Sequence, residues 1–232
     1  MVATGTRDLD SLNLVGGHVA LDLVNSLDPR EGPEERIDYL FDYRAVARWA
    51  VRASVISNTR CEELLALAAS SPRNARAVWR RVVRLREALF RVLRSLVRNE
   101  PPAPGDIAVI DAERRRADRQ TALLARRRQL DDSSAAFEIV ISKSAELDAP
   151  VRMLVRAAVE LLTEADPTRL RECPAEHGGC GWIVLDETRN RSRQWCDMRV
   201  CGTRAKAARL TDRRREARAS GSPKRAVAGG PS

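Results

Sequence analysis

Four of the five cysteines lie within one 29-residue stretch near the C-terminus, in the order Cys173, Cys180, Cys196 and Cys201. Six residues separate the first pair, four separate the second pair, and fifteen residues lie between the pairs. Two turns that each carry two thiols, joined by a short ribbon, can supply the four ligands of a tetrahedral zinc site. We therefore predict one structural zinc ion bound by these four cysteines, rather than disulfides or free thiols.

A histidine offers an alternative ligand. His177 lies three residues before Cys180, so it could replace Cys173 or Cys180 in a site of three cysteines and one histidine. Both arrangements are closed, because four protein ligands leave no open coordination position. The metal is therefore expected to fold a small module and to catalyse nothing.

The same stretch is strongly basic. Between residues 189 and 215 there are ten basic side chains, opposed only by Asp197, Asp212 and the adjacent Glu216. Gly202 interrupts the chain after the last cysteine, and Thr203 can cap a following helix, which could enter a major groove or lie along a phosphate backbone. A solvated basic helix in an arginine-rich protein is the alternative. The residues predicted to contact nucleic acid are Arg189, Arg191, Arg193, Arg204, Lys206, Arg209 and Arg213.

Three short runs in this stretch carry a resemblance to a known family. They are Cys180-Gly181-Trp182, Trp195-Cys196-Asp197-Met198 and Cys201-Gly202-Thr203-Arg204. Together they resemble the CGNR-type zinc finger, which is named for the four residues that begin at its last cysteine. Thr203 stands where the family name has Asn, and Asp197 stands where Ser is usual, but neither residue is a metal ligand.

An upstream segment extends the resemblance to nearly the whole chain. Residues 16–28, Gly-Gly-His-Val-Ala-Leu-Asp-Leu-Val-Asn-Ser-Leu-Asp, resemble the opening of the ABATE domain, which precedes the finger in that family. The resemblance implies a stress-linked transcriptional regulator.

The composition fits a cytoplasmic protein with a polyanionic partner. The 232 residues can hold one sizeable domain and a small one, and a hydrophobic fraction of 44% with only 4% aromatic residues predicts a core of Leu, Val and Ala. The net charge is +9, but only three of the 41 basic residues are lysines, so the clustering of arginines is better evidence than their number. We find no membrane-spanning run and no signal peptide, so we expect a cytoplasmic protein with free thiols.

The clearest secondary-structure signal is a heptad pattern over residues 73–98. Its apolar positions are Val78, Val82, Leu85, Leu89, Val92 and Leu96. They step alternately by four and three residues, which predicts a long helix in a bundle, with a two-stranded coiled coil as the alternative.

Weaker patterns predict a mainly α fold with one minor β element. Helices are expected over residues 37–51, 62–69 and 106–130, and a further helix starts at residue 148 and ends at residue 166. Residues 136–141 alternate as in a strand, whereas residues 18–27 have helical spacing but are few enough to form a strand.

These elements divide the chain into four parts. We expect a flexible N-terminus over residues 1–13, a helical ABATE-like domain over 14–168, a finger with a short hairpin and a C-terminal helix over 169–217, and a disordered tail over 218–232. The helical domain and the finger are expected to have separate cores.

A third polar group lies near the N-terminus. His18, Asp22 and Asn25 would share one face of a helix. They could line a pocket for a small-molecule effector, or Asp22 and Asn25 could tie this segment to neighbouring helices by hydrogen bonds, which is the interpretation we favour.

The motifs together predict a zinc-dependent, DNA-binding transcriptional regulator, whose N-terminal domain senses an effector or forms a homodimer. The alternatives are an RNA-binding or ribosome-associated protein and a protein–protein adaptor. An enzyme is not expected, because the sequence has no nucleophile–base pair, phosphate-binding loop or open metal site.

Overall fold

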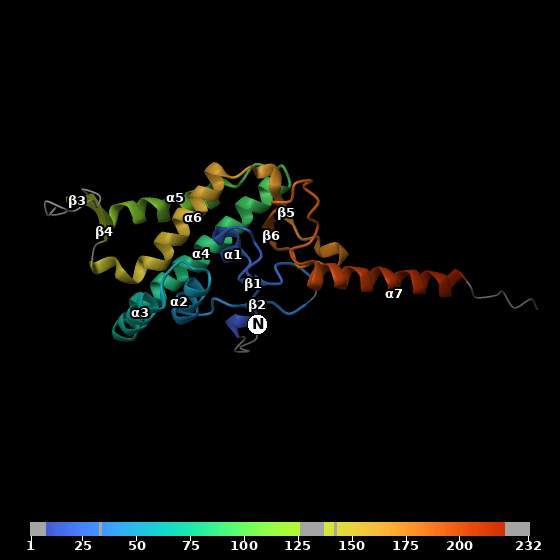
Figure 1. The fold of residues 1–232 in the computed structure, drawn as a ribbon, viewed down its shortest axis with the longest axis horizontal. Coiled ribbons are helices and arrows are strands. Elements are labelled where there is room, and N and C mark those ends of the chain that lie inside the picture. Colours follow the sequence, from blue (N-terminus) through green and yellow to red (C-terminus); the bar gives the residue numbers. More distant parts are fainter. Residues whose placement is uncertain (1–7, 33, 126–136, 142, 221–232) are drawn as a thin grey trace, which may run out of the picture.

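The structure is a computed structural model that describes residues 8–32, 34–125, 137–141 and 143–220. Within these residues the chain forms seven α-helices: α1 Val19–Val24, α2 Tyr43–Arg52, α3 Asn58–Ser70, α4 Pro72–Val97, α5 Pro104–Arg119, α6 Ala149–Glu164 and α7 Thr203–Ser220 (Figure 1). Three antiparallel strand pairs accompany them: β1 Leu27–Asp28 with β2 Ile37–Asp38, β3 Thr121–Ala125 with β4 Phe137–Ile141, and β5 Leu170–Glu172 with β6 Ile183–Leu185. The predicted mainly α fold is therefore confirmed.

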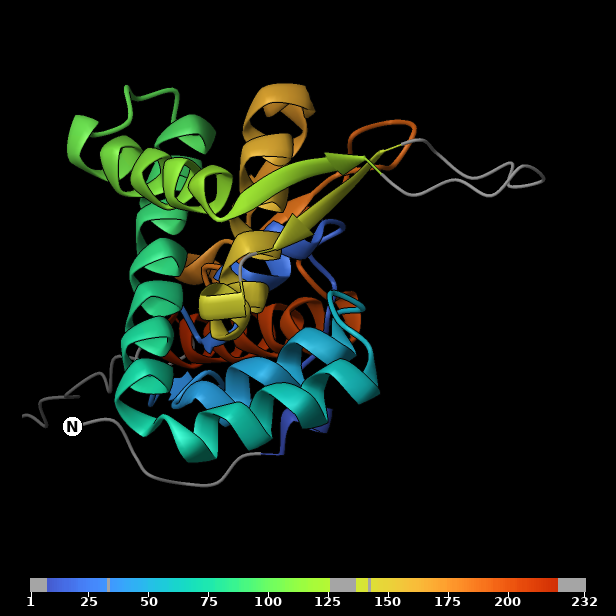
Figure 2. The same ribbon diagram turned by 90° about the vertical axis from the view of Figure 1, so that its left-hand side faces the viewer.

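Helix α4 organises the helical part of the molecule. Its heptad residues Val82, Leu85 and Leu89 are fully buried, and the helix contacts α1, α2, α5 and α6 (Figures 1 and 2). The predicted bundle is confirmed, because helices of the same chain cover the seam that a coiled coil would offer to a partner.

Two predicted helices have the wrong boundaries. The helix expected over residues 37–51 begins only at Tyr43, because Asp42 caps it by accepting a hydrogen bond from the Ala45 N–H at 2.7 Å. Residues Ile37–Asp38 form β2 instead. The helix expected over residues 106–130 ends at Arg119, because Thr121–Ala125 pairs with Phe137–Ile141; the expected residues 126–130 lie outside the described part. A strand requires a partner for its backbone groups, and this requirement overrides the helical propensity of the Ala-Leu-Leu-Ala run.

The remaining predicted elements are close to their observed bounds. The strand expected over residues 136–141 is β4, and the helix that follows is α6. Residues 18–27 supply both the helix α1 and Leu27 of β1. The short helix expected over residues 62–69 extends to Asn58–Ser70, because Ser57 caps it.

The expectation of separate cores is wrong. One hydrophobic cluster includes residues of helices α1 to α6, both finger strands and all four clustered cysteines. Strand β5 contacts α4, and β6 contacts both α1 and α4. The finger and the helical domain therefore share one core.

The two ends of the described chain also differ from expectation. Leu12, in the segment predicted to be flexible, is only 1% exposed and follows the short 3-10 helix Leu9–Ser11. Helix α7 continues to Ser220, so residues 218–220 are helical rather than part of a disordered tail. The outer parts of both predicted segments, 1–7 and 221–232, lie outside the described residues. Across the described residues, the helices are too short or too polar for any of them to cross a membrane.

Helix α4 provides a test of this core. Leu89→Asp places an unpaired carboxylate in a fully buried position, so it should lower the free energy of unfolding by about 4 kcal/mol or more. Urea denaturation followed by circular dichroism measures the change. Arg84→Asp, at an exposed position of the same helix, should change it by about 1 kcal/mol or less. Similar effects of the two substitutions would contradict the assigned core.

Candidate metal centre and nucleic-acid interface

The first cysteine pair is positioned by the β5–β6 hairpin. Cys173 directly follows β5, and its N–H donates to the carbonyl of Trp182 at 2.8 Å, which extends the hairpin by one more backbone hydrogen bond. The chain returns through a tight turn in which a Cβ atom at Gly179 would lie 2.7 Å from the Cys173 Sγ. The glycine therefore allows the turn to close around the sulfur and to place Cys180 beside Cys173.

The second pair is positioned by a single turn of π-helix, Met198–Gly202, which runs into α7. Its N-cap is Asp197, whose carboxylate accepts a hydrogen bond from the Arg199 N–H at 2.7 Å. Asp and Ser are both good N-cap residues, so Asp197 can do here what the usual Ser would do. Cys201 lies in this turn, and Thr203 begins α7.

The four cysteines meet at one point. Their Sγ atoms all lie within 4.8 Å of one another, all four residues are buried, and Cys196 Sγ is 3.5 Å from the Sγ atoms of both Cys180 and Cys201. A tetrahedron with Zn–S bonds of about 2.3 Å places its sulfurs about 3.8 Å apart, so this cluster fits zinc. His177 is exposed and is not a member of the cluster, so the alternative site with a histidine ligand has no support.

Comparison with known families agrees with this geometry. A family model described as "Putative stress-induced transcription regulator", named ABATE, matches residues 17–165. The chain belongs to the ABATE family. A model of the CGNR zinc finger matches residues 169–214, so the ABATE domain precedes a CGNR finger, and together with the cysteine cluster this supports one structural zinc ion. Both are regulatory families and not enzyme families, and a search of curated proteins found no match.

The ABATE domain holds the finger by hydrogen bonds to backbone groups. The Asn25 side chain donates to the Ile183 carbonyl at 2.9 Å and accepts from the Ile183 N–H at 3.0 Å. The N–H groups of Arg30 and Glu31 donate to the Cys180 carbonyl at 2.8 and 3.1 Å. These contacts fix both a finger strand and a cysteine turn on the segment that follows α1.

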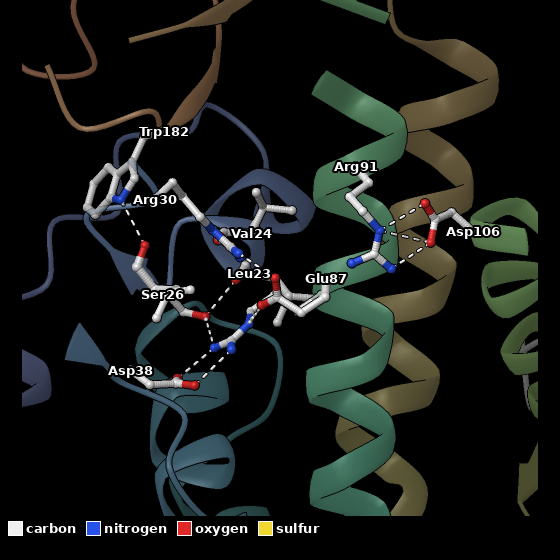
Figure 3. Close-up of polar contacts among 11 residues, drawn as sticks. Leu23, Val24, Ser26, Arg30, Asp38, Glu87, Arg91, Asp106 and Trp182 are labelled. Carbon is white, nitrogen blue, oxygen red and sulfur yellow. Dashed lines mark hydrogen bonds and ion pairs between the residues drawn. The ribbon is translucent and has the colours of Figure 1, made fainter. Parts of the chain in front are cut away.

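Two finger residues complete this contact. Trp182 is 5% exposed, and its indole N–H donates to the Leu27 carbonyl at 3.2 Å (Figure 3). Gly181 has a φ of +73°, and a Cβ atom there would lie 3.0 Å from the Glu31 nitrogen. Glycine thus permits a conformation and a close approach that other residues would disturb.

A buried ionic network supports the docking segment from the other side. The Arg30 side chain is 2% exposed and pairs with Glu87 of α4 at 2.7 Å (Figure 3). Its guanidinium carbon lies 4.4 Å from the centroid of the Phe90 ring. Burial lowers the pKa of Arg30 to about 10 despite the nearby Glu87 carboxylate. Arg86 pairs with Asp38 at 2.6 Å. Burial alone would raise the pKa of Asp38, but the hydrogen bonds and the positive charge of Arg86 have the larger combined effect, so the pKa of Asp38 is lowered. The network anchors the residues around β1 and β2 to α4.

The His18, Asp22 and Asn25 group serves structural roles. His18 caps α1 by accepting a hydrogen bond from the Ala20 N–H at 3.2 Å. Asp22 accepts from the Gly16 N–H at 2.8 Å, and burial raises its pKa. With Asn25 bonded to Ile183, this geometry agrees with hydrogen bonding rather than with a ligand pocket, although Asn25 joins the finger and not a neighbouring helix.

Three of the predicted nucleic-acid residues have partners within the molecule. The Arg193 guanidinium donates to the carbonyls of Val15 and Cys196 at 2.7 Å each, which joins the N-terminal segment to the cysteine loop. Arg191 pairs with Asp166 at 3.3 Å. Arg204, the arginine of the family signature, pairs with Glu34 of the ABATE domain at 3.1 Å.

The other four predicted residues form no ion pair with any side chain that the structure describes, which on α7 are those up to residue 215. They are Arg189, Lys206, Arg209 and Arg213, and all four are exposed. The last three lie on α7, which extends away from the rest of the molecule (Figure 1). The sequence analysis grouped these four residues with the paired arginines.

The sequence analysis also missed the residues that dock the finger, which are Arg30, Glu31, Glu34 and Gly181. Their only signal in the sequence is their position, just after the ABATE opening or within the finger motif.

The Asn25 contact gives a direct test of docking. Asn25→Ala leaves the buried N–H and carbonyl of Ile183 without their partners, so it should lower the free energy of unfolding by about 2 kcal/mol or more. Amide hydrogen exchange over β5 and β6 should become faster. Asn74→Ala, at an exposed position of α4, is the control and should change neither measurement. Unchanged exchange in Asn25→Ala would show that this contact does not hold the finger.

Proposed function

We propose that this ABATE protein is a cytoplasmic, zinc-dependent transcriptional regulator that binds DNA through one face of α7. The observation that carries the proposal is the exposed basic face formed by Lys206, Arg209 and Arg213, with which no described side chain forms an ion pair. These residues lie on a helix that extends from the body of the molecule (Figure 1). Steps of three and four residues place these side chains on one side of a helix. An exposed row of unpaired cations is suited to a phosphate backbone or to base edges in a major groove.

The zinc ion supplies rigidity in this proposal. We assign its ligands as Cys173, Cys180, Cys196 and Cys201, because their sulfurs converge within zinc-binding distance. Cys201 lies two residues before α7, and Ala205 in the first turn of α7 is only 2% exposed. The metal and this packing fix where α7 leaves the body, so the basic face has a defined position relative to the hairpin.

A groove beside α7 supports the assignment of this surface to nucleic-acid binding. It has a volume of about 530 Å³, and its lining includes Arg171, His177, Arg191, Trp195 and Arg209. The lining holds one acidic residue, Glu172, against four arginines, so its balance of charge and its half-buried tryptophan suit a sugar–phosphate chain. The groove and the α7 face share Arg209, so one nucleic-acid strand can contact both.

Arg204 has a positioning role in this proposal and does not contact DNA. At about 100° per residue, Lys206, Arg209 and Arg213 lie roughly 140–200° around the helix from Arg204. Arg204 therefore points away from the basic face and pairs with Glu34 of the ABATE domain. Arg193 is likewise assigned to the fold, because four backbone carbonyls accept its hydrogen bonds.

Zinc removal tests the ligand assignment. Cys196→Ser should purify with less than about a tenth of the wild-type zinc, because three ligands bind more weakly than a closed set of four. The whole chain should then melt in one transition at a lower temperature, because the finger shares its core with the helices. Metal analysis and calorimetry measure both effects, and Cys61→Ser, outside the cluster, is the control that should keep its zinc. A second transition at the wild-type melting temperature would contradict the shared core.

DNA binding is tested with matched triple variants. Changing Lys206, Arg209 and Arg213 to Gln should weaken binding to a duplex and lower the log–log salt slope by up to about 2.7, since each phosphate contact contributes about 0.9. Changing Arg73, Arg76 and Arg80 to Gln removes the same charge with the same spacing from an exposed face of α4 and should leave both values unchanged. Fluorescence anisotropy at several salt concentrations gives both quantities.

Other outcomes of this experiment favour other functions. Equal losses in the two triple variants would show that only net charge attracts DNA. Tighter binding to RNA than to the duplex would favour an RNA-binding protein. Absence of binding to either polymer at low salt would favour a protein adaptor and refute the proposal.

A further inference from the structure

The β3–β4 hairpin leaves strand β3 exposed along its whole length. Among the described strands, β3 pairs with β4 alone, and no described backbone group outside β4 bonds to it. The hairpin follows α5 and lies at the opposite end of the molecule from α7 (Figures 1 and 2). A two-stranded hairpin is at best marginally stable on its own in water, and a further strand stabilises it.

The exposed strand is apolar. Its sequence is Thr-Ala-Leu-Leu-Ala, and Leu123 is 67% exposed, the highest value among the large hydrophobic residues that the structure describes. Leu124 is 49% exposed, and because side chains alternate along a strand, the two leucines lie on opposite faces. Phe137, which is opposite Ala125 in the register, is 57% exposed. Water therefore contacts an apolar strand that the described part of its own chain does not cover.

Strand β3 has none of the features that keep edge strands from pairing. It has no charged residue, no proline and no bulge in its register with β4. In an antiparallel pair, the N–H and C=O groups of alternate residues point away from the partner, so the outer edge of β3 offers these groups to a further strand. Nucleic acid does not suit this edge, because β3 has no cation for a phosphate. An uncharged strand does suit it.

A second copy of β3 meets this requirement. The chain has a net charge of +9 and many exposed arginines, so two copies repel each other over much of their surfaces but not along β3. Antiparallel pairing of β3 with itself about a two-fold axis at Leu123 places Ala122 opposite Leu124 of the partner subunit. Thr121 is then opposite Ala125 of the partner subunit, so no like charges meet.

We propose that β3 is a homodimer surface, at which two copies pair their β3 strands into a four-stranded sheet with Leu123 facing Leu123 of the partner subunit. Because the hairpin and α7 lie at opposite ends of each copy, the dimer carries its two α7 helices at its outer ends (Figure 1). Each copy contributes one short strand, so the interface is small and the dimer dissociates in the micromolar range. Association is measured without DNA, so this proposal can fail while DNA binding holds.

The test measures association of the zinc-loaded full chain by sedimentation equilibrium. The wild-type chain should change from monomer to dimer between about 5 μM and about 500 μM. Leu123→Lys should weaken association at least about tenfold, because two ammonium groups then face each other across the axis. Leu210→Lys makes the same change at an exposed position of α7 and should leave association unchanged. Circular dichroism and zinc content should stay at wild-type values in both variants, because both leucines are exposed.

A charge swap tests the two-fold pairing itself. Leu123→Glu alone should be monomeric like Leu123→Lys, but an equimolar mixture of the two variants should recover the dimer, because a carboxylate then faces an ammonium group. The proposal is overturned if the wild-type chain stays monomeric up to about 500 μM. It is also overturned if Leu123→Lys dimerises as the wild type does, if Leu210→Lys weakens association equally, or if the mixture stays monomeric.

Discussion

The structure depends on the docking of a small metal-binding module onto a helical domain through backbone groups. The Asn25 side chain bonds the backbone of Ile183 as a neighbouring strand would, because its amide both donates to the Ile183 carbonyl and accepts from the Ile183 N–H. A three-residue hairpin in water would be marginal on its own. Here β6 gains Asn25 on one side, and the indole of the adjoining Trp182 is buried against the segment that follows α1. The zinc ligands close the other end of the hairpin, so metal binding and docking stabilise the same few residues.

The core shared by the two modules explains why the ABATE opening motif contains polar residues. Gly16 offers its carbonyl to Leu185, Asp22 orients the Gly16 N–H, and Asn25 holds Ile183. The motif is polar in an apolar segment because its side chains satisfy backbone groups, those of Gly16 and Ala20 within the motif and those of Ile183 in the finger. A sequence pattern of this kind resembles a ligand site, since both need converging polar groups. Only the position of the finger in space distinguishes the two.

The features that the sequence predicted well are those whose physics is local. The spacing of the cysteines indicates their convergence, because a turn and a hairpin are short-range structures, and the heptads of α4 indicate a buried seam by periodicity alone. The strand β3 was missed because its partner lies twelve or more residues away, and the helical propensity of its own residues favours the wrong answer. The roles of Arg193 and Arg204 were missed for the same reason: Val15 and Glu34 are their partners, and both are far away in the sequence.

The sequence analysis gave the total arginine content little weight, and the structure explains why this content says little about a binding surface. Arg30, Arg81, Arg86 and Arg94 are committed to carboxylates inside or at the edge of the core, so much of the positive charge forms internal pairs rather than a binding surface. Buried guanidinium groups need such partners, because an unpaired one carries a large desolvation penalty. The exposed cations of α7 are informative against this background, because none of the described side chains forms an ion pair with them.

Helix α6 and the finger are joined by a short series of contacts. Helix α6 contacts α1, and α1 contacts β6. A ligand bound to the helical domain can change DNA binding through this route only if it binds two arrangements of α6 with different affinity, and the size of that difference limits the effect. Because α1, β6 and the cysteines share one core, the Asn25 contact is the place where a shift of α1 would reach the hairpin directly.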